Sequence, residues 1–447
     1  MTLEELKGVP FIHPLDQEAI LLDYAKAIMV IYKFKTLNDT KEILYYKDGI
    51  YQFGGDVIIK QECERIIPEC SKYKVNEVMG IIERKTFESR KNFNNDLSKL
   101  VLANGIFDLV TFELSPFSPE FLSTIKVPIV YDPKATCPQF IKFLKAVLPD
   151  KKDIITVIEE TSNILTTNKK NFEVSAIWIG TGANGKSTLL KIIRGVIGQD
   201  NCSSISIHDI EEQRFAIAQL YSKLANISAD ISNDGLEGLS RYKQLVSGDG
   251  IQVEKKGKEP FDLYNFAKMF FSANDMPNIK DNSDGAFRRI FVTKFENTFL
   301  RGSNCIQDLD KIILETEQSG IFNLVLENYK TLLRNNHFRY EQPIGVVREI
   351  IKKESDKLLE FIKSVWDEDP NGVIGKDRFY EIQQKYMKDK HYEIYSKQRL
   401  GANLPTYGFR SDSRKINGKA HRVWLGFSLK KNDDWVKNNV KGLDEYV

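Results

Sequence analysis

Eight consecutive residues have the types and the spacing of a loop that binds phosphate. The run Gly180-Thr181-Gly182-Ala183-Asn184-Gly185-Lys186-Ser187 fits the pattern G-x-x-x-x-G-K-[ST]. Glycines allow successive backbone N–H groups to turn inward around a β-phosphate, at the positive end of a helix dipole. We therefore expect Lys186 to bridge the β- and γ-phosphates of ATP, Ser187 to complete the shell of Mg²⁺, and Thr188 to line the same pocket.

The flanking residues supply the elements that such a loop needs. The apolar run VSAIWI (174–179) predicts a strand that leads into the loop, and STLLKIIRGVIG (187–198) has apolar residues at helical spacing. The alternative is a chance glycine-rich turn. Because a chance turn needs neither a strand before it nor a helix after it, this context favours a P-loop ATPase.

Two polar residues that follow later apolar strands are candidates for work at the γ-phosphate. Asp230 comes after the run KLANIS (223–228), where a carboxylate can hold the water shell of Mg²⁺ or polarise the attacking water. Asn274 directly follows the run AKMFFSA (267–273), and from there a side chain can touch both the γ-phosphate and that water. The plain alternatives are a loop aspartate and a turn-forming asparagine before a proline-containing loop.

An arginine pair and a lysine-rich segment complete the set of candidates. Arg288 and Arg289 precede the apolar run IFVTKF (290–295), and a guanidinium supplied to a γ-phosphate can raise the rate by roughly a thousandfold or more. The alternative is a solvated arginine pair. The lysines at 255, 256 and 258 lie in QVEKKGKEPF (252–261), which taken alone fits a solvated hairpin turn.

The apolar pattern predicts the elements that position these residues. Residues 17–32 predict a helix, and Asp48-Gly49 between β-prone runs predicts a hairpin, because both turn positions favour positive φ. Charged amphipathic helices are expected from residue 57 to about 98, followed by strand-like alternation around Asn104-Gly105. From about 150 to 300, helices alternate with short apolar strands at 174–179, 224–229 and 266–273, which predicts an α/β fold with a mainly parallel sheet.

The C-terminal part has a different pattern. From Lys357 the sequence predicts two helices and then a basic hairpin with Asn417-Gly418 as its turn, an order that suggests a winged-helix-like module. The expected domains are a mainly helical, collar-like N-terminal domain (1–135), a P-loop ATPase core (136–300), a helical extension and linker (301–355), a winged-helix-like domain (356–430) and a polar tail (431–447).

The composition is that of a folded protein without long disordered tracts, since 42% of the 447 residues are hydrophobic and 28% are charged. With a net charge of +2, any nucleic-acid site must be a local cluster of Lys and Arg. No apolar run approaches the roughly 20 residues of a membrane span, and the N-terminus lacks a signal-peptide pattern, so we expect a cytoplasmic protein with no membrane contact. Five scattered cysteines and five scattered histidines argue against structural zinc or a disulfide framework.

Four segments together resemble the superfamily 3 helicases, an AAA+-like branch found in small DNA viruses, phages and plasmids. These segments are GTGANGKST, LANISADIS, KQLVSGDGIQVEKKGKEPF and FFSANDMPNIKDNSDGAFRRI. The greatest similarity is to the helicase part of phage/plasmid and poxvirus-type primase-helicases, whose loop reads G-x-G-x-N-G-K-S/T. The resemblance implies an α/β AAA+-like P-loop ATPase core with a mainly helical N-terminal domain and a C-terminal winged-helix-like domain.

The resemblance also implies roles for single residues at the nucleotide. Lys186 and Ser187 match the P-loop pair, Asp230 stands at the Walker B acid and would share Mg²⁺ with Ser187, and Asn274 matches the sensor-1 asparagine. One departure concerns the acid. Many relatives have two adjacent acids, whereas here the next acid is Asp234, so the identity of the general base stays open.

The resemblance implies two further roles, one in contact with a neighbouring subunit and one in contact with DNA. Arg288 or Arg289 matches an arginine finger that acts across a subunit interface. Lys255, Lys256 and Lys258 match the basic tip of a hairpin that projects into a central channel, where the family contacts DNA.

The function implied is that of a replicative DNA helicase of a virus, phage or plasmid. By analogy we expect an ATPase ring, a hexameric homo-oligomer that moves along single-stranded DNA and meets forked or duplex DNA at an origin. Family chains often carry a primase-polymerase domain first. Here the helical domain begins almost at Met1, so we expect no primer synthesis, and whether a separate primase or polymerase docks is left open.

Two other classes of function stay in view. The chain could be a P-loop ATPase that works as a nucleotide-dependent switch or assembly scaffold without unwinding. It could also be a small-molecule phosphotransferase, although Asn274 and the arginine pair have no obvious use there. RNA in place of DNA is open as well, because phosphate contacts do not sense the 2′-OH.

Overall fold

Contacts within the computed structural model group the chain into two units, Met1–Arg348 and Glu349–Val447. The structure describes residues 14–96, 98–165, 172–180, 182–229, 231, 236, 238–274, 276, 279, 281, 283–300, 305–390, 392, 394–416, 419–430 and 432–440. The five predicted segments are finer than these two units and stay a prediction. In the described part of the chain, no helix combines the length and the apolar character that crossing a bilayer requires.

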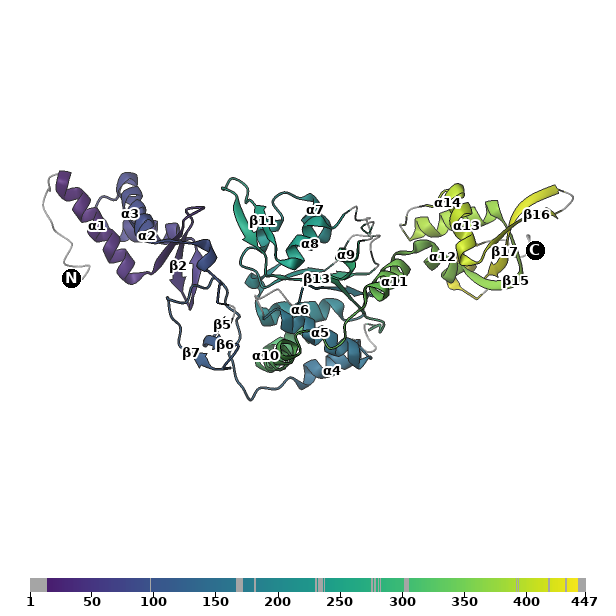
Figure 1. Cartoon of the computed structure of the whole chain (residues 1–447), viewed down its shortest axis with the longest axis horizontal. Coiled ribbons are helices and arrows are strands. Elements are labelled where there is room, and N and C mark those ends of the chain that lie inside the picture. Colours follow the sequence, from purple (N-terminus) through teal and green to yellow (C-terminus); the bar gives the residue numbers. More distant parts are fainter. Residues whose placement is uncertain are drawn as a thin grey trace. The chain divides into compact units, whose positions relative to one another are not determined.

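The N-terminal part of the first unit combines helices with two small sheets (Figure 1). Its elements are α1 (Pro14–Ile31), β1 (Phe34–Leu37), β2 (Ile43–Lys47), β3 (Ile50–Phe53), α2 (Gly55–Ile66), α3 (Lys72–Lys85), β4 (Phe87–Glu88), η1 (Arg90–Asn92), β5 (Lys99–Leu102), β6 (Gly105–Asp108) and β7 (Leu114–Ser115). The strand orders are β3-β2-β1-β4 and β5-β6-β7. The hairpin expected around Asp48-Gly49 is confirmed as the antiparallel pair β2–β3, and the strand-like alternation expected around Asn104-Gly105 is confirmed as the antiparallel pair β5–β6.

A five-stranded sheet lies at the centre of the first unit. Its strands are β8 (Ser175–Ile179), β9 (Cys202–Ser203), β10 (Ala225–Ala229), β13 (Lys268–Ala273) and β14 (Ile290–Lys294). They lie in the order β14-β8-β13-β10-β9, and each neighbouring pair is parallel. The predicted mixed α/β character and the three predicted strands are therefore confirmed. Since parallel strands end at the same edge of a sheet, the C-terminal ends of β8, β10 and β13 lie together there.

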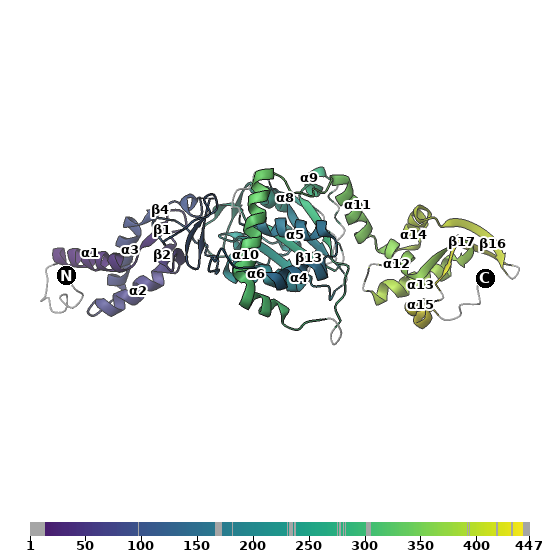
Figure 2. The ribbon, with the colours of Figure 1, turned by 90° about the horizontal axis from the view of Figure 1, so that it is seen from below.

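Helices cover both faces of this sheet (Figures 1 and 2). One face carries α4 (Pro138–Val147), α5 (Lys151–Asn163), α6 (Lys186–Ile197) and α10 (Leu309–Asn335), and the other carries α7 (Ile207–Glu212), α8 (Ser240–Ser247) and α9 (Asp284–Phe287). The remaining elements are η2 (Gln199–Asn201), η3 (Ile217–Leu220) and the antiparallel hairpin of β11 (Gly250–Val253) and β12 (Phe261–Tyr264). Helix α10 packs along α5 and α6, which fixes α6 against the sheet.

A buried carboxyl group lies under the strand that leads into the candidate loop. Glu160 on α5 accepts a hydrogen bond from Trp178 Nε1 on β8 at 3.0 Å. Burial nevertheless raises the pKa of Glu160 from its ordinary value of 4.5 to about 8. The folded chain therefore keeps a proton that the unfolded chain releases between pH 4.5 and about 8, and the free energy of unfolding falls as pH rises through that window.

Glu160→Gln removes this titration but leaves an amide oxygen for Trp178. The melting temperature of the variant, relative to that of the unmodified chain, is expected to rise between pH 5 and pH 8, by an amount equivalent to roughly 3 kcal/mol. Burial lowers the pKa of Lys268 to about 7, and this shift has the opposite effect on the free energy of unfolding. Because both proteins contain Lys268, comparing them at the same pH cancels its contribution. Thermal unfolding at three pH values measures the difference, and a difference that does not change with pH would contradict the assignment.

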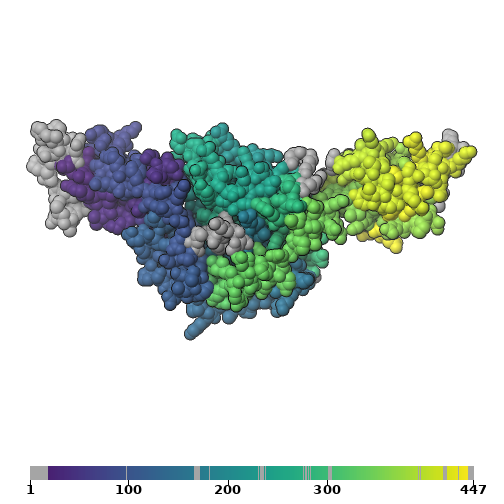
Figure 3. Space-filling view, in the orientation of Figure 1, coloured from purple at the N-terminus to yellow at the C-terminus, as the bar shows by residue number. Residues whose placement is uncertain are grey.

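The second unit has three antiparallel strands and a helical layer. Helix α11 (Ile344–Ser355) crosses the division between the units. The following elements are α12 (Lys357–Val365), β15 (Trp366–Gly375), α13 (Lys376–Asp389), α14 (Lys397–Asn403), η4 (Leu404–Tyr407), β16 (Arg410–Ile416), β17 (Lys419–Leu429) and α15 (Asp434–Asn439). The strand order is β15-β17-β16, and β16 and β17 extend beyond the helices of this unit (Figures 1 and 3). The predicted turn Asn417-Gly418 lies outside the described residues.

Candidate functional site

The candidate phosphate loop joins β8, which ends at Ile179, to α6, which begins at Lys186. A Cβ atom on Gly180 would lie 2.2 Å from Asn184 Nδ2 and 2.4 Å from the carbonyl oxygen of Phe295, so the close approach requires glycine. Gly185 has a φ of +87°, in the left-handed region that favours glycine. Glycine is therefore needed at position 180 for close packing and at position 185 for the backbone conformation. Thr181, the second residue of the predicted loop, lies outside the described residues.

The ammonium group of Lys186 lies inside this loop. Its Nζ donates to the carbonyl oxygen of Gly180 at 2.6 Å and to Asn184 Oδ1 at 3.2 Å. Asn184 is itself buried, and its Nδ2 donates to the carbonyl oxygen of Phe295 at 3.3 Å. Asn184 therefore holds Lys186 and the loop together. A positive charge fixed at the N-terminus of a helix is a site for an anion.

A cavity of about 260 Å³ opens over the loop. It is lined by Gly182, Ala183, Asn184, Gly185, Lys186, Ser187, Thr188, Ala229, Ser272 and Asn274. Asn274 follows β13 directly, so the structure brings it to the same cavity as Lys186 although they are far apart in sequence. Asp230 and Asp234 lie outside the described residues. Asp230 directly follows Ala229, a residue of the cavity wall.

The lining of the cavity fits ATP and Mg²⁺ chemically. The buried Lys186 ammonium and the N-terminus of α6 match a phosphate group. A Cβ built on Gly182 would meet no atom within 4 Å, so the loop leaves open space beside its backbone. Ser187, which is exposed, and Ser272 contribute hydroxyl oxygens, and Mg²⁺ prefers oxygen ligands.

The structure separates the two arginines of the predicted finger. Arg289 is buried, with Nε donating to Ser247 Oγ at 2.9 Å, Nη1 to the carbonyl oxygen of Gly285 at 2.6 Å, and Nη2 reaching Glu173 Oε2 at 3.3 Å. Arg288, in contrast, is exposed at the end of α9. Neither arginine lines the cavity of its own chain. Arg289 therefore has a structural role, and Arg288 is available to a second molecule.

The structure also separates the three predicted DNA-binding lysines. All three lie in the connection between β11 and β12. Lys255 is half-buried, with its Nζ 3.3 Å from Glu42 Oε1 and 4.9 Å from the ring centroid of Phe53. Lys256 and Lys258 are exposed. The hairpin thus presents two lysines to solvent and uses the third to contact the N-terminal part of the unit.

Sequence reasoning missed some residues of these sites. Ser272 lies two residues before Asn274 and lines the same cavity. A signal for it existed, because Ser272 is a polar residue near the C-terminal end of β13, directly after the apolar run Met269–Phe271. Arg90 and Tyr221, which pack against the hairpin residue Phe261, had no comparable signal. Their contacts join segments that are remote in sequence.

Basic side chains also gather on the hairpin of the second unit. Arg410, Arg414, Lys415 and Arg422 are exposed, and of these Arg414 lies 3.6 Å from Asp412 Oδ2. Trp424 is buried against Phe409. The hairpin is therefore anchored by an aromatic core and carries positive charge on its surface.

Comparison with known proteins matches both halves of the first unit. The family described as D5 N terminal like matches residues 20–149, and a family of unknown function, DUF5906, matches residues 178–289. "Putative helicase 184R" of Invertebrate iridescent virus 6 is 26% identical over 283 residues, which is 58% of this chain and 28% of the relative. "Putative helicase L207/L206" of Acanthamoeba polyphaga mimivirus is 25% identical over 239 residues, 49% of this chain and 24% of the relative.

The chain spans about a quarter of the length of these curated relatives. The solved apo structure of the NrS-1 C terminal region (305-718) aligns with 91% of this chain and 99% of its own length, at 14% identity and a TM-score of 0.49. The two family matches and the relatives named as helicases confirm the resemblance found in the sequence. This chain therefore combines a D5 N terminal like region with a DUF5906 region that follows it, and in this combination it is similar to proteins of the primase-helicase type.

Proposed function

We propose that this chain is an ATP-dependent DNA helicase module that moves along single-stranded DNA. The observation that carries the proposal is the cavity in which the P-loop lysine, Lys186, and Asn274 from a neighbouring strand meet. The names of the relatives support a helicase, since both are described as putative helicases. DNA-stimulated ATP hydrolysis and unwinding of a forked duplex by the purified chain test the proposal; ATP hydrolysis without either response to DNA would contradict it.

The order of the strands supports an AAA+-like core. Numbered along the chain, the sheet has the order 5-1-4-3-2, with the P-loop strand β8 between β14 and β13. Strand β13 therefore separates β8 from β10, the strand that Asp230 follows. Asn274, which directly follows β13, therefore stands between the loop after β8 and the end of β10, where it could orient a water. Asn274 is accordingly proposed as the sensor-1 residue and Asp230 as the Walker B acid.

ATP would supply the phosphoryl group, and Mg²⁺ would neutralise its charge. The chain's own part is positioning and electrostatics. Lys186 holds a positive charge at the start of α6, Ser187 and Asp230 offer oxygen ligands to the metal, and Asn274 orients water from the opposite wall. Transfer to water needs no covalent step on the protein.

The contacts of the arginines support a homo-oligomer with ATP at each subunit boundary. Arg289 is committed to Ser247, Gly285 and Glu173 within its own chain, whereas Arg288 is exposed and outside its own cavity. A guanidinium that serves a γ-phosphate from this position must serve that of a neighbour. We therefore assign the finger to Arg288. A closed ring, with six subunits as the family expectation, gives every cavity such a neighbour.

Lys256 and Lys258 are the proposed grip on the DNA backbone. Replacing both by Ala is expected to weaken binding of single-stranded DNA and to lower the slope of log K against log salt by about 1.4 or more, because each lost phosphate contact contributes about 0.7. Lys255 is left unchanged, since its ion pair with Glu42 would confuse the result.

Fluorescence anisotropy with a labelled oligonucleotide at four salt concentrations measures this slope. The matched control is Lys142→Ala with Lys145→Ala, which removes the same charge from two exposed positions on α4. An equal slope for the hairpin variant and the control would refute the assignment of the hairpin.

The second unit supports a further contact with duplex DNA. Its order of helix, strand, two helices and two strands is the order of a winged helix, with β16 and β17 as the wing. The exposed basic residues lie on that wing. We assign this unit as winged-helix-like and as the part that meets duplex DNA at a fork or an origin.

One observation favours the scaffold alternative. Lys255 binds Glu42 and lies 5.8 Å from the ring centroid of Tyr221, so the hairpin is tied to its surroundings rather than loose. A nucleotide-dependent scaffold would keep this contact throughout its cycle and would hydrolyse ATP at the same rate with and without DNA. Stimulation by single-stranded DNA therefore separates the two functions.

A further inference from the structure

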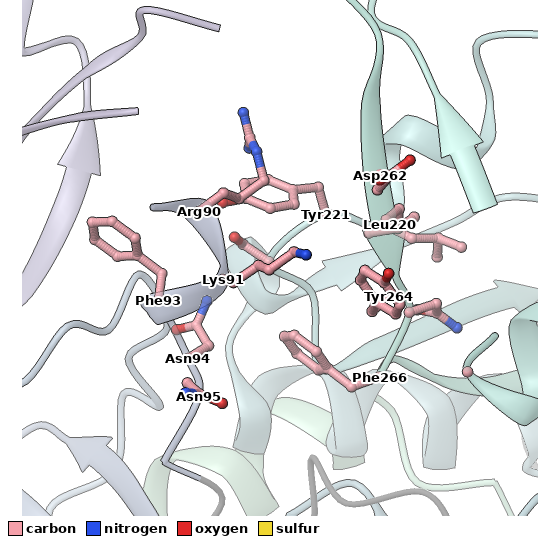
Figure 4. Close-up of a pocket in the computed structure, with 14 residues that line it drawn as sticks. Arg90, Lys91, Phe93, Asn94, Asn95, Leu220, Tyr221, Asp262, Tyr264 and Phe266 are labelled. Atoms are coloured by element: carbon pink, nitrogen blue, oxygen red, sulfur yellow. The ribbon is translucent and has the colours of Figure 1, made fainter. Parts of the chain in front are cut away.

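A second cavity of about 400 Å³ lies in the first unit, where residues 90–95 face the core (Figure 4). Its polar and aromatic lining includes Lys91, Asn94, Asn95, Asp262, Tyr264 and Phe266. Figure 4 shows Lys91 reaching from one wall towards Tyr264 on the other. The second wall is formed by β12 and the residues after it, so this cavity and the lysine-bearing tip belong to the same hairpin.

Tyr264 gives this cavity a flat, accessible ring. Tyr264 is 56% exposed and ends β12 of the two-stranded hairpin. It pairs in register with Gly250, and a Cβ built on Gly250 would lie 3.0 Å from Cε1 of the tyrosine ring. The tyrosine ring therefore packs against the backbone of Gly250, in space that a side chain at position 250 would occupy.

The charges in the cavity favour a base over a phosphate. Lys91 Nζ lies 5.9 Å from the ring centroid of Tyr264. Asp262 is exposed on the same face of β12 as Tyr264, so a negative charge accompanies the positive one. A phosphate group placed in the cavity would be repelled by the carboxylate, whereas a base can donate a ring or amino N–H to it and stack on the tyrosine ring.

The two walls are held together by Arg90. Its guanidinium donates to Asp39 at 2.7 and 3.0 Å, and its centre lies 4.5 Å from the ring centroid of Tyr221 and 4.3 Å from that of Phe261. Arg90 is buried and its charge is paired with Asp39, so it joins the two walls of the cavity. The cavity is therefore built around a fixed frame.

We propose that this cavity receives a nucleobase, and that the base belongs to the DNA strand gripped by Lys256 and Lys258. This inference rests on the proposed function. Strand β12 has four residues and is about 13 Å long, so it separates the phosphate grip at the tip from the base site at its other end. The hairpin would thus contact the strand twice, once through charge and once through stacking on Tyr264.

The test uses the full chain and two labelled strands of 20 nucleotides at matched salt. One is oligo-dT, and the other is an abasic strand that keeps the phosphates but has no bases. The unmodified chain is expected to bind oligo-dT about tenfold more tightly. Tyr264→Ala should bring this ratio close to one by weakening oligo-dT alone, and Tyr264→Phe should keep it. Tyr73→Ala, at another exposed tyrosine, is the control that should also keep it.

The outcomes distinguish this inference from the proposed function. If the Lys256→Ala, Lys258→Ala variant weakens both strands while Tyr264→Ala leaves the ratio unchanged, the base site is wrong and the phosphate grip stands. If neither strand binds the unmodified chain, the proposed function itself fails. Titration with free dTMP tests the other source of a base: binding of dTMP that Tyr264→Ala removes, with an unchanged strand ratio, would assign the cavity to a free nucleotide and overturn the strand proposal.

Discussion

Lys186→Ala is expected to abolish ATP turnover while the chain stays folded. The ammonium is the positive charge that the loop holds at the start of α6, through Gly180 and Asn184. Its loss removes charge stabilisation at the transferring phosphoryl group, which is worth roughly a thousandfold or more in rate. Phosphate release measures turnover, and circular dichroism with thermal unfolding measures the fold.

The control for this variant lies on the same helix. Lys191 on α6 is 68% exposed and lies 3.9 Å from Asp310 Oδ2, so Lys191→Ala removes one charge without touching the cavity. It should keep ATP turnover near the value of the unmodified chain. Turnover retained by Lys186→Ala would refute the phosphate assignment and with it the proposed ATPase.

Arg288→Ala is expected to cost about a thousandfold in ATP turnover and to be rescued by mixing with Lys186→Ala subunits. In the mixture, some boundaries join an intact Lys186 on one subunit to an intact Arg288 on the next. With equal amounts and random order, about a quarter of the boundaries have this composition, so about a quarter of full activity should return. Phosphate release from mixed and unmixed samples measures it.

Arg289→Ala provides the contrast. Because Arg289 is buried and bonded to Ser247, Gly285 and Glu173, its loss leaves polar groups without their partner and should lower the melting temperature. The exposed Arg288 should tolerate Ala with no such fall. Full rescue by Arg289→Ala, with none by Arg288→Ala, would reverse the assignment of the finger.

The local features of the site could be predicted from sequence because their causes are local. The run from Gly180 to Ser187 has its strand before it and its helix after it, and an apolar run identified β13 and so the position of Asn274. The sequence could not rank Arg288 and Arg289. Their difference depends on Glu173 and Ser247, which pairing within the fold brings to Arg289 alone.

The contacts of the hairpin formed by β11 and β12 could not be predicted from the sequence either. Nothing in the sequence distinguishes Lys255 from Lys256 and Lys258. In the structure, Lys255 Nζ contacts Glu42, which is 213 positions away in the sequence. The two-residue strand β9 carries too few residues to show a period. In each case the missing information is a tertiary contact, which neither propensity nor periodicity encodes.

Arg90 has a mechanical consequence for the hairpin. Through Asp39 and Phe261 it links the first sheet of the N-terminal part to β12. Displacing β12 alone would take the Phe261 ring away from the buried Arg90 guanidinium, which stays paired with Asp39 on the N-terminal side. If ATP hydrolysis moves this hairpin, the N-terminal sheet is therefore expected to move with it. The moving part of the chain would then be larger than the hairpin itself.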